Sequence, residues 1–452
     1  MKRGWLSGLM GLGLSAIVLA APEKRPNVLV ILADDLGYHD LGFQGSTTIK
    51  TSNLDWLASQ GVRFTDAHVT GSTCSPSRAG FITGRYPHRF GYEANCPPKD
   101  KGLDVNERTI GQAFQEAGYR TAVFGKWHLG DLPERYPTVR GFDVFYGLRE
   151  GGRSYWYNKK DDRPGSARAA EHNGKLVKFD GHFTDWLGEN AIHFMKETKK
   201  PFFVYLSFTA PHGPLQSKKE DMKAVGLPRN RYAGLIYGMD RNVGYVIEAL
   251  KKSRKLDNTM IWFFSDNGGI VRQSSNAPLG GIKGTFFEGG HRVPFVLYWK
   301  GHLTAGTVYN KMVSSMDVFP TSLTAAGGSL KQERPLDGVD LIPYLTGKKK
   351  GAPHETLCWR KCPIATIRHG DWKLIRVDDY GSALYNLKDD LGEQHDLSKK
   401  MPEKTAQLEK ELKTWESTKK KALWREQKRW QTWRYNYHIS WFKTGKPPGK
   451  KK

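Results

Sequence analysis

Four apolar runs of the chain each pass directly into a polar cluster. The runs cover residues 27–33, 121–124, 202–208 and 260–265, and they lead into Asp34-Asp35, Gly125-Lys126-Trp127-His128, Ala210-Pro211-His212 and Asp266-Asn267. Short continuous apolar runs are typical of strands buried on both faces of a parallel sheet. Helical periodicity at residues 184–195 and 232–253 separates these strands, as a doubly wound α/β fold requires. Such sheets bind ligands beyond the carboxyl ends of their strands, so the four clusters are predicted to meet in one crevice.

A further stretch, residues 71–80, places a cysteine where a helix is about to begin. Ser75 is expected to cap this helix, Pro76 suits its first position, and Gly84 is expected to end it. A thiol at a helix start beside Arg78 is expected to have a lowered pKa and an anion site next to it. The sequence alone leaves open a second interpretation of Cys74, as a buried structural cysteine.

Two pairs of oxygen ligands follow two of the predicted strands. Asp34 and Asp35 follow the first, and Asp266 and Asn267 follow the last. Carboxylate and amide oxygens favour calcium or magnesium over zinc or copper. Adjacent aspartates can also cap a helix, but two such pairs after two separate strands favour a metal site.

Several motifs of the chain resemble those of the type I sulfatases, including the N-acetylgalactosamine-6-sulfatase and arylsulfatase A-like members. They are Cys-Ser-Pro-Ser-Arg-Ala-Gly at 74–80, Thr-Gly-Arg at 83–85, Gly-Lys-Trp-His-Leu-Gly at 125–130, Ala-Pro-His-Gly-Pro-Leu at 210–215 and Gly-Ile-Lys-Gly-Thr at 281–285. The resemblance runs from about Arg25 to Leu397. It implies an α/β fold of the alkaline phosphatase-like kind: a large, mostly parallel central sheet flanked by helices, followed by a small C-terminal subdomain with an antiparallel sheet.

The resemblance also implies residue roles. Cys74 would be oxidised by a separate formylglycine-generating enzyme to Cα-formylglycine (3-oxoalanine), whose hydrate is the nucleophile. Arg78 and Lys126 would hold that hydrate, and Lys283 would hold the sulfate. His212 would act as the acid, and His128 as the base that lets the sulfated hydrate collapse and release sulfate. One calcium ion, with magnesium as the alternative, would be bound by five residues: Asp34, Asp35, residue 74, Asp266 and Asn267.

Substrate contacts are predicted from basic and aromatic residues near these motifs. The candidates are Arg85, His88, Arg89, Tyr155, Trp156, His172, His291 and Arg292. The long irregular segment 149–182 is expected to help form the substrate cleft, because long loops in compact domains are usually functional. His291 stands where many sulfatases carry an aliphatic residue, which indicates either a substrate contact or local packing.

The chain is divided into four segments. Residues 1–20 have the parts of a secretory signal peptide, with an uncleaved anchor as the alternative, and predict an exported periplasmic or extracellular protein. Residues 21–350 form the catalytic domain, residues 351–418 a small α+β subdomain, and residues 419–452 a basic, tryptophan-rich extension outside the resemblance. Part of the extension is expected to dock on the body or line the cleft. Export would permit a local disulfide between Cys358 and Cys362.

Lysine and arginine outnumber the acids by 70 to 46, a formal net charge of +24, which favours a polyanionic partner. No nucleic-acid-binding motif is present, so a sulfated carbohydrate is the preferred partner. The sequence therefore predicts a sulfatase acting on a sulfated polysaccharide or its oligosaccharides, with carrageenan, ulvan, fucoidan and glycosaminoglycans all open. The alternatives are a formylglycine-dependent phosphonate or phosphodiester hydrolase and a non-catalytic polyanion-binding relative. Oligomeric state is left open.

Overall fold

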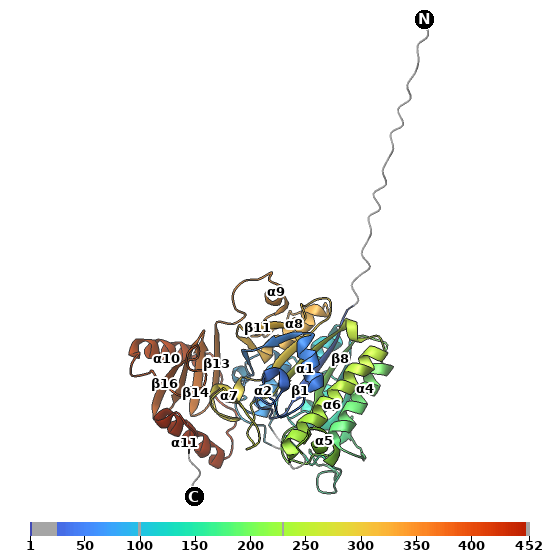
Figure 1. The fold of residues 1–452 in the computed structure, drawn as a ribbon, viewed down its shortest axis with the longest axis horizontal. Helices are drawn as coiled ribbons and strands as arrows, with labels where there is room; N and C mark the ends of the chain where they lie inside the picture. Colours follow the sequence, from blue (N-terminus) through green and yellow to red (C-terminus); the bar gives the residue numbers. More distant parts are fainter. Residues whose placement is uncertain (2–24, 98–100, 228–229, 449–452) are drawn as a thin grey trace.

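A ten-stranded sheet forms the centre of the molecule (Figure 1). The computed structural model describes residues 1, 25–97, 101–227 and 230–448. The strand order is β11-β2-β10-β9-β1-β8-β4-β5-β6-β7. The bounds are β1 Asn27–Ala33, β2 Val62–Phe64, β4 Arg120–Lys126, β5 Val144–Leu148, β6 Glu171–His172, β7 Lys175–Leu176, β8 Phe202–Ser207, β9 Thr259–Ser265, β10 Phe295–Tyr298 and β11 Thr307–Tyr309.

The four strands predicted from the apolar runs lie side by side in this sheet. β1 runs parallel to β8 and to β9, and β4 runs parallel to β8 and β5, whereas β10 is antiparallel to β9. The carboxyl ends of β9, β1, β8 and β4 therefore point the same way, which confirms the mostly parallel α/β class. A separate short pair joins β3 (Ala67–His68) to β12 (Val313–Ser314).

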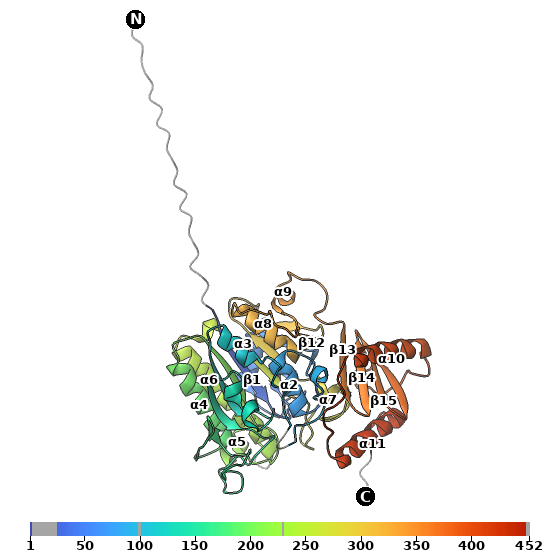
Figure 2. The same ribbon diagram turned by 180° about the vertical axis from the view of Figure 1, so that it is seen from behind.

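Helices cover both faces of the sheet (Figures 1 and 2). Their bounds are α1 Ser52–Ser59, α2 Cys74–Thr83, α3 Ile110–Glu116, α4 Phe183–Glu197, α5 Lys219–Ala224, α6 Arg231–Lys252, α7 Glu288–His291, α8 Val318–Ala325 and α9 Ile342–Leu345. Alternate residues of β1 enter opposite cores: Leu29 and Ile31 pack in the core shared with α1, α4 and α6, whereas Val28 and Val30 pack in the core shared with α2, α3 and α8. This alternation is why β1 is apolar at every position from Val28 to Ala33.

A second, four-stranded antiparallel sheet follows, as predicted for the small subdomain. Its strands are β13 Thr356–Lys361, β14 Ile364–His369, β15 Trp372–Val377 and β16 Gly381–Asn386, in that order. Leu408 and Leu412 of α10 (Pro402–Ser417) pack on one face of this sheet. Tyr437 and Trp441 of α11 (Lys428–Thr444) pack on its other face together with Phe287 of the main domain. The C-terminal extension therefore docks on the body, which confirms that expectation.

The helix that carries Cys74 begins two residues earlier than predicted. Thr73 occupies the N-cap position and Cys74 is the first helical residue. Ser75 does not cap the helix because its hydroxyl instead donates to the carbonyl of His128 at 2.7 Å. Gly84 ends the helix with a left-handed φ of 64°, as expected.

Of two further expectations about the chain, the structure bears on the first only. The disulfide between Cys358 and Cys362 is not formed, and both are free thiols; Cys358 lies in β13, with its side chain buried in the core under α10. The predicted signal peptide, residues 1–20, lies outside the described residues apart from Met1. Across the described ranges, the helices are too short or too polar to cross a membrane.

Candidate functional site

The polar clusters at the strand ends meet around Cys74. Its Sγ lies 3.5 Å from Asp34 Oδ1 and 3.8 Å from Asp35 Oδ1, both of which follow β1. Lys283 Nζ donates to Asp35 Oδ1 at 2.5 Å and lies 3.2 Å from the sulfur. His212, which follows β8, places Nε2 3.6 Å from Asp35 Oδ2. Residues up to about 250 positions apart in the chain thus share one site, as the crevice argument predicted.

Arg78 and Lys126 form the floor of this site. The guanidinium of Arg78 pairs with Asp266 at 2.8 Å and donates to the Lys126 carbonyl at 2.9 Å and to Ser207 Oγ at 2.6 Å. Lys126 Nζ donates to Asp34 Oδ2 at 2.6 Å. Both side chains are buried, so these charge-assisted contacts hold them in place.

The donor set beside Cys74 fits a hard divalent cation. Asp34, Asp35 and Cys74 lie with His212 in a group whose ligand atoms are all within 4.8 Å of one another. Asn267 Nδ2 donates to Asp35 Oδ1 at 2.8 Å, while Asn267 Oδ1 is buried without a hydrogen-bond partner among the described residues. A buried orphan acceptor beside carboxylates is an arrangement that a calcium or magnesium ion would satisfy.

The carboxylates and cations of the site shift one another's pKa values. Burial opposes ionisation of Asp34, but Lys126, His212 and Arg78 outweigh it and hold the pKa of this carboxyl well below its usual range. Burial and the negative charge of Asp34 raise the pKa of Asp266 to about 6. Burial alone would lower the pKa of Lys283. The neighbouring Asp35 carboxylate stabilises the charged lysine and outweighs burial, so the pKa of Lys283 is raised.

The expected low thiol pKa of Cys74 is wrong. Burial, reinforced by the carboxylates of Asp266 and Asp34, raises the pKa of the thiol to about 12, against the pull of Lys126 and Lys283. Helix position alone suggested the opposite shift, but desolvation exceeds the effect of a helix N-terminus here. An unmodified Cys74 would therefore stay protonated and be a poor nucleophile near neutral pH.

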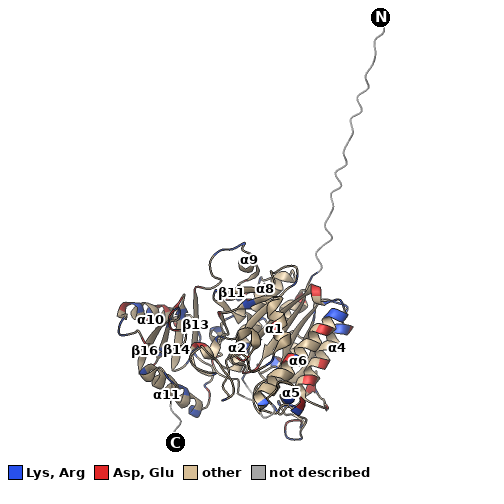
Figure 3. Cartoon of the chain, in the orientation of Figure 1, with Lys and Arg blue, Asp and Glu red and all other residues tan. Residues whose placement is uncertain are grey.

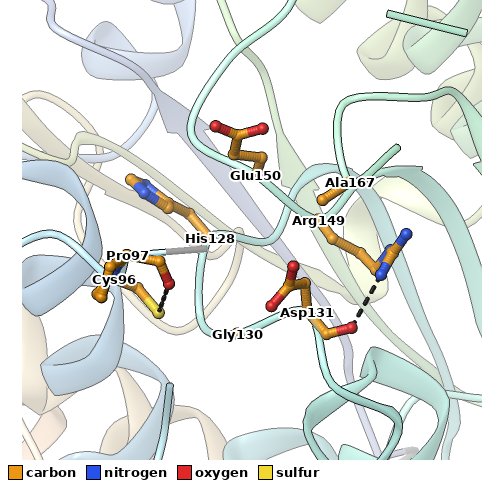
Figure 4. Close-up of a pocket in the computed structure, with 8 residues that line it drawn as sticks. All are labelled: Cys96, Pro97, His128, Gly130, Asp131, Arg149, Glu150 and Ala167. Atoms are coloured by element: carbon orange, nitrogen blue, oxygen red, sulfur yellow. Dashed lines mark hydrogen bonds between the residues drawn. The ribbon is translucent and has the colours of Figure 1, made fainter. Parts of the chain in front are cut away.

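Two site residues have a left-handed backbone conformation that is uncommon outside glycine. Asp35 has a φ of 65° and His128 a φ of 55°. Burial together with the charge of Lys126 holds the pKa of His128 well below its usual value, so its imidazole is neutral and able to accept a proton. A small cavity of about 20 Å³ lies beside His128, lined also by Asp131, Arg149 and Glu150 (Figure 4).

A larger cavity of about 380 Å³ opens above the polar cluster. It is lined by Asp35, Thr73, Asn95, His212, Gly213, Ile270, Val271, Lys283, Gly284, Glu426, Trp430, Trp433 and Arg434. Of the predicted substrate contacts, Tyr155 is the one bonded to this region: its buried hydroxyl lies 2.7 Å from the Thr209 carbonyl and 2.9 Å from the His212 carbonyl. Tyr155 thus supports the loop that carries His212, and the neighbouring Trp156 is exposed.

Four other predicted substrate contacts are engaged in packing away from the cavity lining. Arg85 pairs with Glu107 at 2.6 Å. Arg89 forms a bidentate ion pair with Asp337, which lies 248 positions away in the sequence. His88 is buried against the backbone of residue 360, and His172 stacks on Tyr146 at a centroid distance of 4.0 Å. These contacts hold segments of the protein together, so the structure gives the four residues packing roles, and their assignment as sugar contacts stays a prediction.

His291 and Arg292 are also buried, in an ion network between the main domain and the small subdomain. Arg292 contacts Asp66 and Glu288, and its Nη2 donates to the Thr65 carbonyl at 2.6 Å. His291 stacks on Trp359 and lies 3.1 Å from the ring of His68. The structure therefore favours the interpretation of His291 as local packing, and it holds Arg292 in the same network.

The same network contains a second group of possible metal ligands, but cations of the protein already occupy its carboxylate. His68, Glu288 and His291 lie close enough to share an ion. However, the Glu288 carboxylate already accepts hydrogen bonds from Lys373 at 2.8 Å and from Arg368 at 3.1 Å. These cations supply the charge that an ion would otherwise bring, and breaking such a buried pair costs about 3–5 kcal/mol.

The sequence led us to expect that part of the C-terminal extension docks on the body or lines the cleft, but it did not single out the residues that line the cavity: Glu426, Trp430, Trp433 and Arg434. The interleaved tryptophans and cations of that segment suggested an interacting surface. This sequence pattern could not assign the residues to the cavity, because nothing in the local sequence indicates which part of the body α11 packs against.

A family model and the curated relatives agree on one family. The family model described as Sulfatase matches residues 26–329. Arylsulfatase G of Rattus norvegicus is 32% identical over 447 residues, which cover 84% of this chain and 84% of that protein. The N-acetylgalactosamine-6-sulfatase of Homo sapiens is 34% identical over 349 residues, covering 72% and 66% respectively. The solved structure of Ps i-CgsB in complex with k-i-k-neocarrahexaose has a TM-score of 0.84 at 36% identity and covers 90% of this chain and 96% of that chain.

Proposed function

The chain belongs to the sulfatase family, and we propose that it removes sulfate from a sulfated galactan oligosaccharide of the carrageenan type. Sulfuric ester hydrolysis is the activity that its family and its relatives share. The similarity to Ps i-CgsB, a structure with a bound neocarrahexaose, carries the choice of substrate. The strong excess of lysine and arginine supports the same choice, because it attracts a polyanionic chain.

The site residues divide the chemistry among them. Oxidised to formylglycine by a separate enzyme, residue 74 would supply a hydrated aldehyde, one hydroxyl of which attacks sulfur while the other later allows sulfate to leave. Lys126 pairs with Asp34 and Lys283 pairs with Asp35, beside residue 74. Both ammonium groups would offset negative charge that builds up on the sulfate oxygens. A calcium ion held by Asp34, Asp35, residue 74, Asp266 and Asn267 would supply further charge stabilisation.

Two histidines are placed for proton transfer. His212 Nδ1 lies 2.6 Å from the Gly213 carbonyl, so this nitrogen carries a proton and Nε2 faces Asp35 and the cavity. Nε2 would protonate the departing sugar oxygen from the imidazolium form, in which both ring nitrogens carry a proton. Burial lowers the pKa of this histidine, and the carboxylates of Asp35 and Asp34 oppose that shift. His128 is held neutral and its Nδ1 is buried without a hydrogen-bond partner among the described residues, which suits a base.

A panel of sulfated glycans tests the substrate. Sulfate released from carrageenan, ulvan, fucoidan and glycosaminoglycan oligosaccharides is measured by ion chromatography, and the desulfated position is assigned by NMR. We expect the highest kcat/KM on a carrageenan oligosaccharide. Release from glycosaminoglycans alone would overturn the substrate class, and faster turnover of an aryl phosphonate than of an aryl sulfate on the same preparation would favour the phosphonate hydrolase alternative.

Removal of divalent metal is expected to abolish activity. Without the ion, the carboxylates of Asp34, Asp35 and Asp266 are left to repel an anionic substrate. The measurement is sulfate release after dialysis against a chelator, followed by addition of calcium, magnesium or zinc. We expect calcium to restore most activity; full activity in the chelated protein, verified metal-free by elemental analysis, would contradict the metal assignment.

We also propose that the protein is exported, on the sequence of residues 1–20 alone. The formylglycine-generating enzyme would then act on the chain before or during export. The N-terminal sequence of the mature protein, purified from the medium or periplasm of its host, tests this; a full-length chain retained in the cytoplasm would contradict it.

A further inference from the structure

The C-terminal helix α11 brings two tryptophans to the cavity that holds the catalytic cluster. Trp430 and Trp433 both line the cavity, one helical turn apart. Trp433 lies next to the loop of the sulfate-binding lysine: a Cβ placed on Gly284 would be 3.4 Å from Trp433 Cζ3. Trp430 is farther out, 6.0 Å from Trp433 between ring centroids, and 44% of its surface is exposed. The two rings therefore extend from the reactive centre to solvent.

Contacts on both sides of the pocket hold this helix in place. Arg434 Nε donates to the Gly284 carbonyl at 2.5 Å, and the Phe286 backbone N–H donates to His438 Nε2 at 3.1 Å. Glu426 pairs with Arg434 and, at 2.9 Å, with Lys361. Lys361 Nζ in turn donates to the hydroxyl of Thr73, the residue before Cys74, at 3.3 Å. Because these contacts fix α11 before any ligand binds, its aromatic wall is preorganised.

The charge around the two rings matches an anionic carbohydrate. The guanidinium carbon of Arg429 lies 5.4 Å from the Trp430 ring centroid, and both residues are exposed. Lys428 and Arg425 are exposed in the same segment, and Figure 3 shows lysine and arginine along α11. The acid of this wall, Glu426, is neutralised by Lys361 and Arg434. An aromatic face with a cation beside it can bind the apolar face of a pyranose and a sulfate group of the same chain.

We propose that Trp433 and Trp430 form a binding subsite for the sugar rings of the substrate, running outward from the ring that loses its sulfate, with Arg429 pairing a further sulfate on the chain. This inference rests on the proposed function, because it takes the substrate to be a sulfated oligosaccharide. The C-terminal extension, residues 419–452, lies outside residues 26–329, the region that the family model matches. Under this proposal, the extension is the part of the chain that selects a long carbohydrate over a small sulfate ester.

Replacement of Trp430 tests the subsite. In the Trp430→Ala variant of the full-length, matured enzyme, we expect KM for a carrageenan hexasaccharide to rise about tenfold or more with kcat nearly unchanged, because truncating a tryptophan that anchors a ligand typically costs more than a factor of ten in affinity. KM for a single-ring aryl sulfate should stay within about twofold, since that substrate does not reach Trp430. Trp430→Phe should recover most of the lost affinity.

Thr432→Ala is the matched control, because Thr432 is exposed on the same helix and is absent from the cavity lining. Equal losses on both substrates in Trp430→Ala would assign the residue a structural role and overturn the inference. Unchanged hexasaccharide KM in both Trp430→Ala and Trp433→Ala would also overturn it.

A binding measurement separates this inference from the proposed function. Calorimetric titration of the hexasaccharide into Cys74→Ala and Cys74→Ala/Trp430→Ala requires no turnover. Weaker binding only in the double variant supports the subsite even if the parent enzyme releases no sulfate from that sugar, in which case the proposed function fails alone. Equal binding by the two variants, with active parent enzyme, would refute the subsite and leave the function standing.

Discussion

Replacing Cys74 by alanine lowers sulfate release by at least about 10⁴-fold, because the substitution removes the side chain from which the nucleophile is made. The side chain is small and buried at the start of α2, so the fold should persist. The measurement is kcat on an aryl sulfate, accompanied by circular dichroism and by the mass of the peptide that spans residue 74 in the parent protein. That peptide should carry the aldehyde rather than a thiol.

Cys362→Ala provides the matched control, because Cys362 is also a free thiol but lies in the turn between β13 and β14. Its activity should equal that of the parent enzyme. Retention of parental activity by Cys74→Ala would refute the nucleophile assignment. An unmodified thiol at residue 74, from a host that matures other sulfatases, would instead support the non-catalytic, polyanion-binding alternative.

Replacing Lys283 by alanine lowers kcat/KM by about 10²- to 10³-fold, the usual cost of losing one preorganised group that stabilises transition-state charge. Lys283 Nζ lies 3.2 Å from the reactive side chain, and its pairing with Asp35 keeps it charged. Lys283→Arg should recover only part of the activity, because the guanidinium cannot occupy the position of a compact ammonium group. The measurement is initial rate against substrate concentration for an aryl sulfate.

Lys311→Ala, at an exposed lysine outside the cavity lining, should leave kcat/KM unchanged. Lys283→Ala should also keep its thermal stabilisation by calcium, since the substitution removes a cation and no oxygen ligand. A loss of activity below about threefold would contradict the role of Lys283. If Lys283→Ala lost activity and its thermal stability also no longer rose with calcium, Lys283 would be assigned to metal binding rather than to substrate binding.

The ends of the strands were predictable because a strand buried on both faces is a continuous apolar run in the sequence. β1 and β9 are apolar at nearly every position and end on Asp34-Asp35 and Asp266-Asn267. The rule that parallel strands expose their carboxyl ends at one edge then brings these residues together without knowledge of any contact. The convergence of Lys126, His212 and Lys283 on Cys74 followed from the same rule and from the motif resemblance.

The sequence is least informative about side chains whose partners lie far away along the chain. Arg89 and Arg292 were assigned to substrate because arginines near a catalytic motif are common anion contacts, but the structure pairs Arg89 with Asp337 and Arg292 with Asp66. Cys74 was assigned a low pKa because a helix N-terminus is visible in sequence. Burial and the neighbouring Asp266 carboxylate raise the pKa of Cys74 to about 12, and neither of them is visible in the local sequence.

The amino-acid sequence by itself therefore determined the α/β class, the residues that form the catalytic strands and the identity of the reactive cluster, because each depends on local periodicity and on residues at the ends of strands. Only the tertiary structure decided which face of the body receives α11, and with it that Trp430 and Trp433 border the cavity. Helix docking depends on shape and on pairs such as Arg434 with the Gly284 carbonyl, 150 positions apart. Such pairs have no signature within any one segment, since the two partners meet only after the chain has folded.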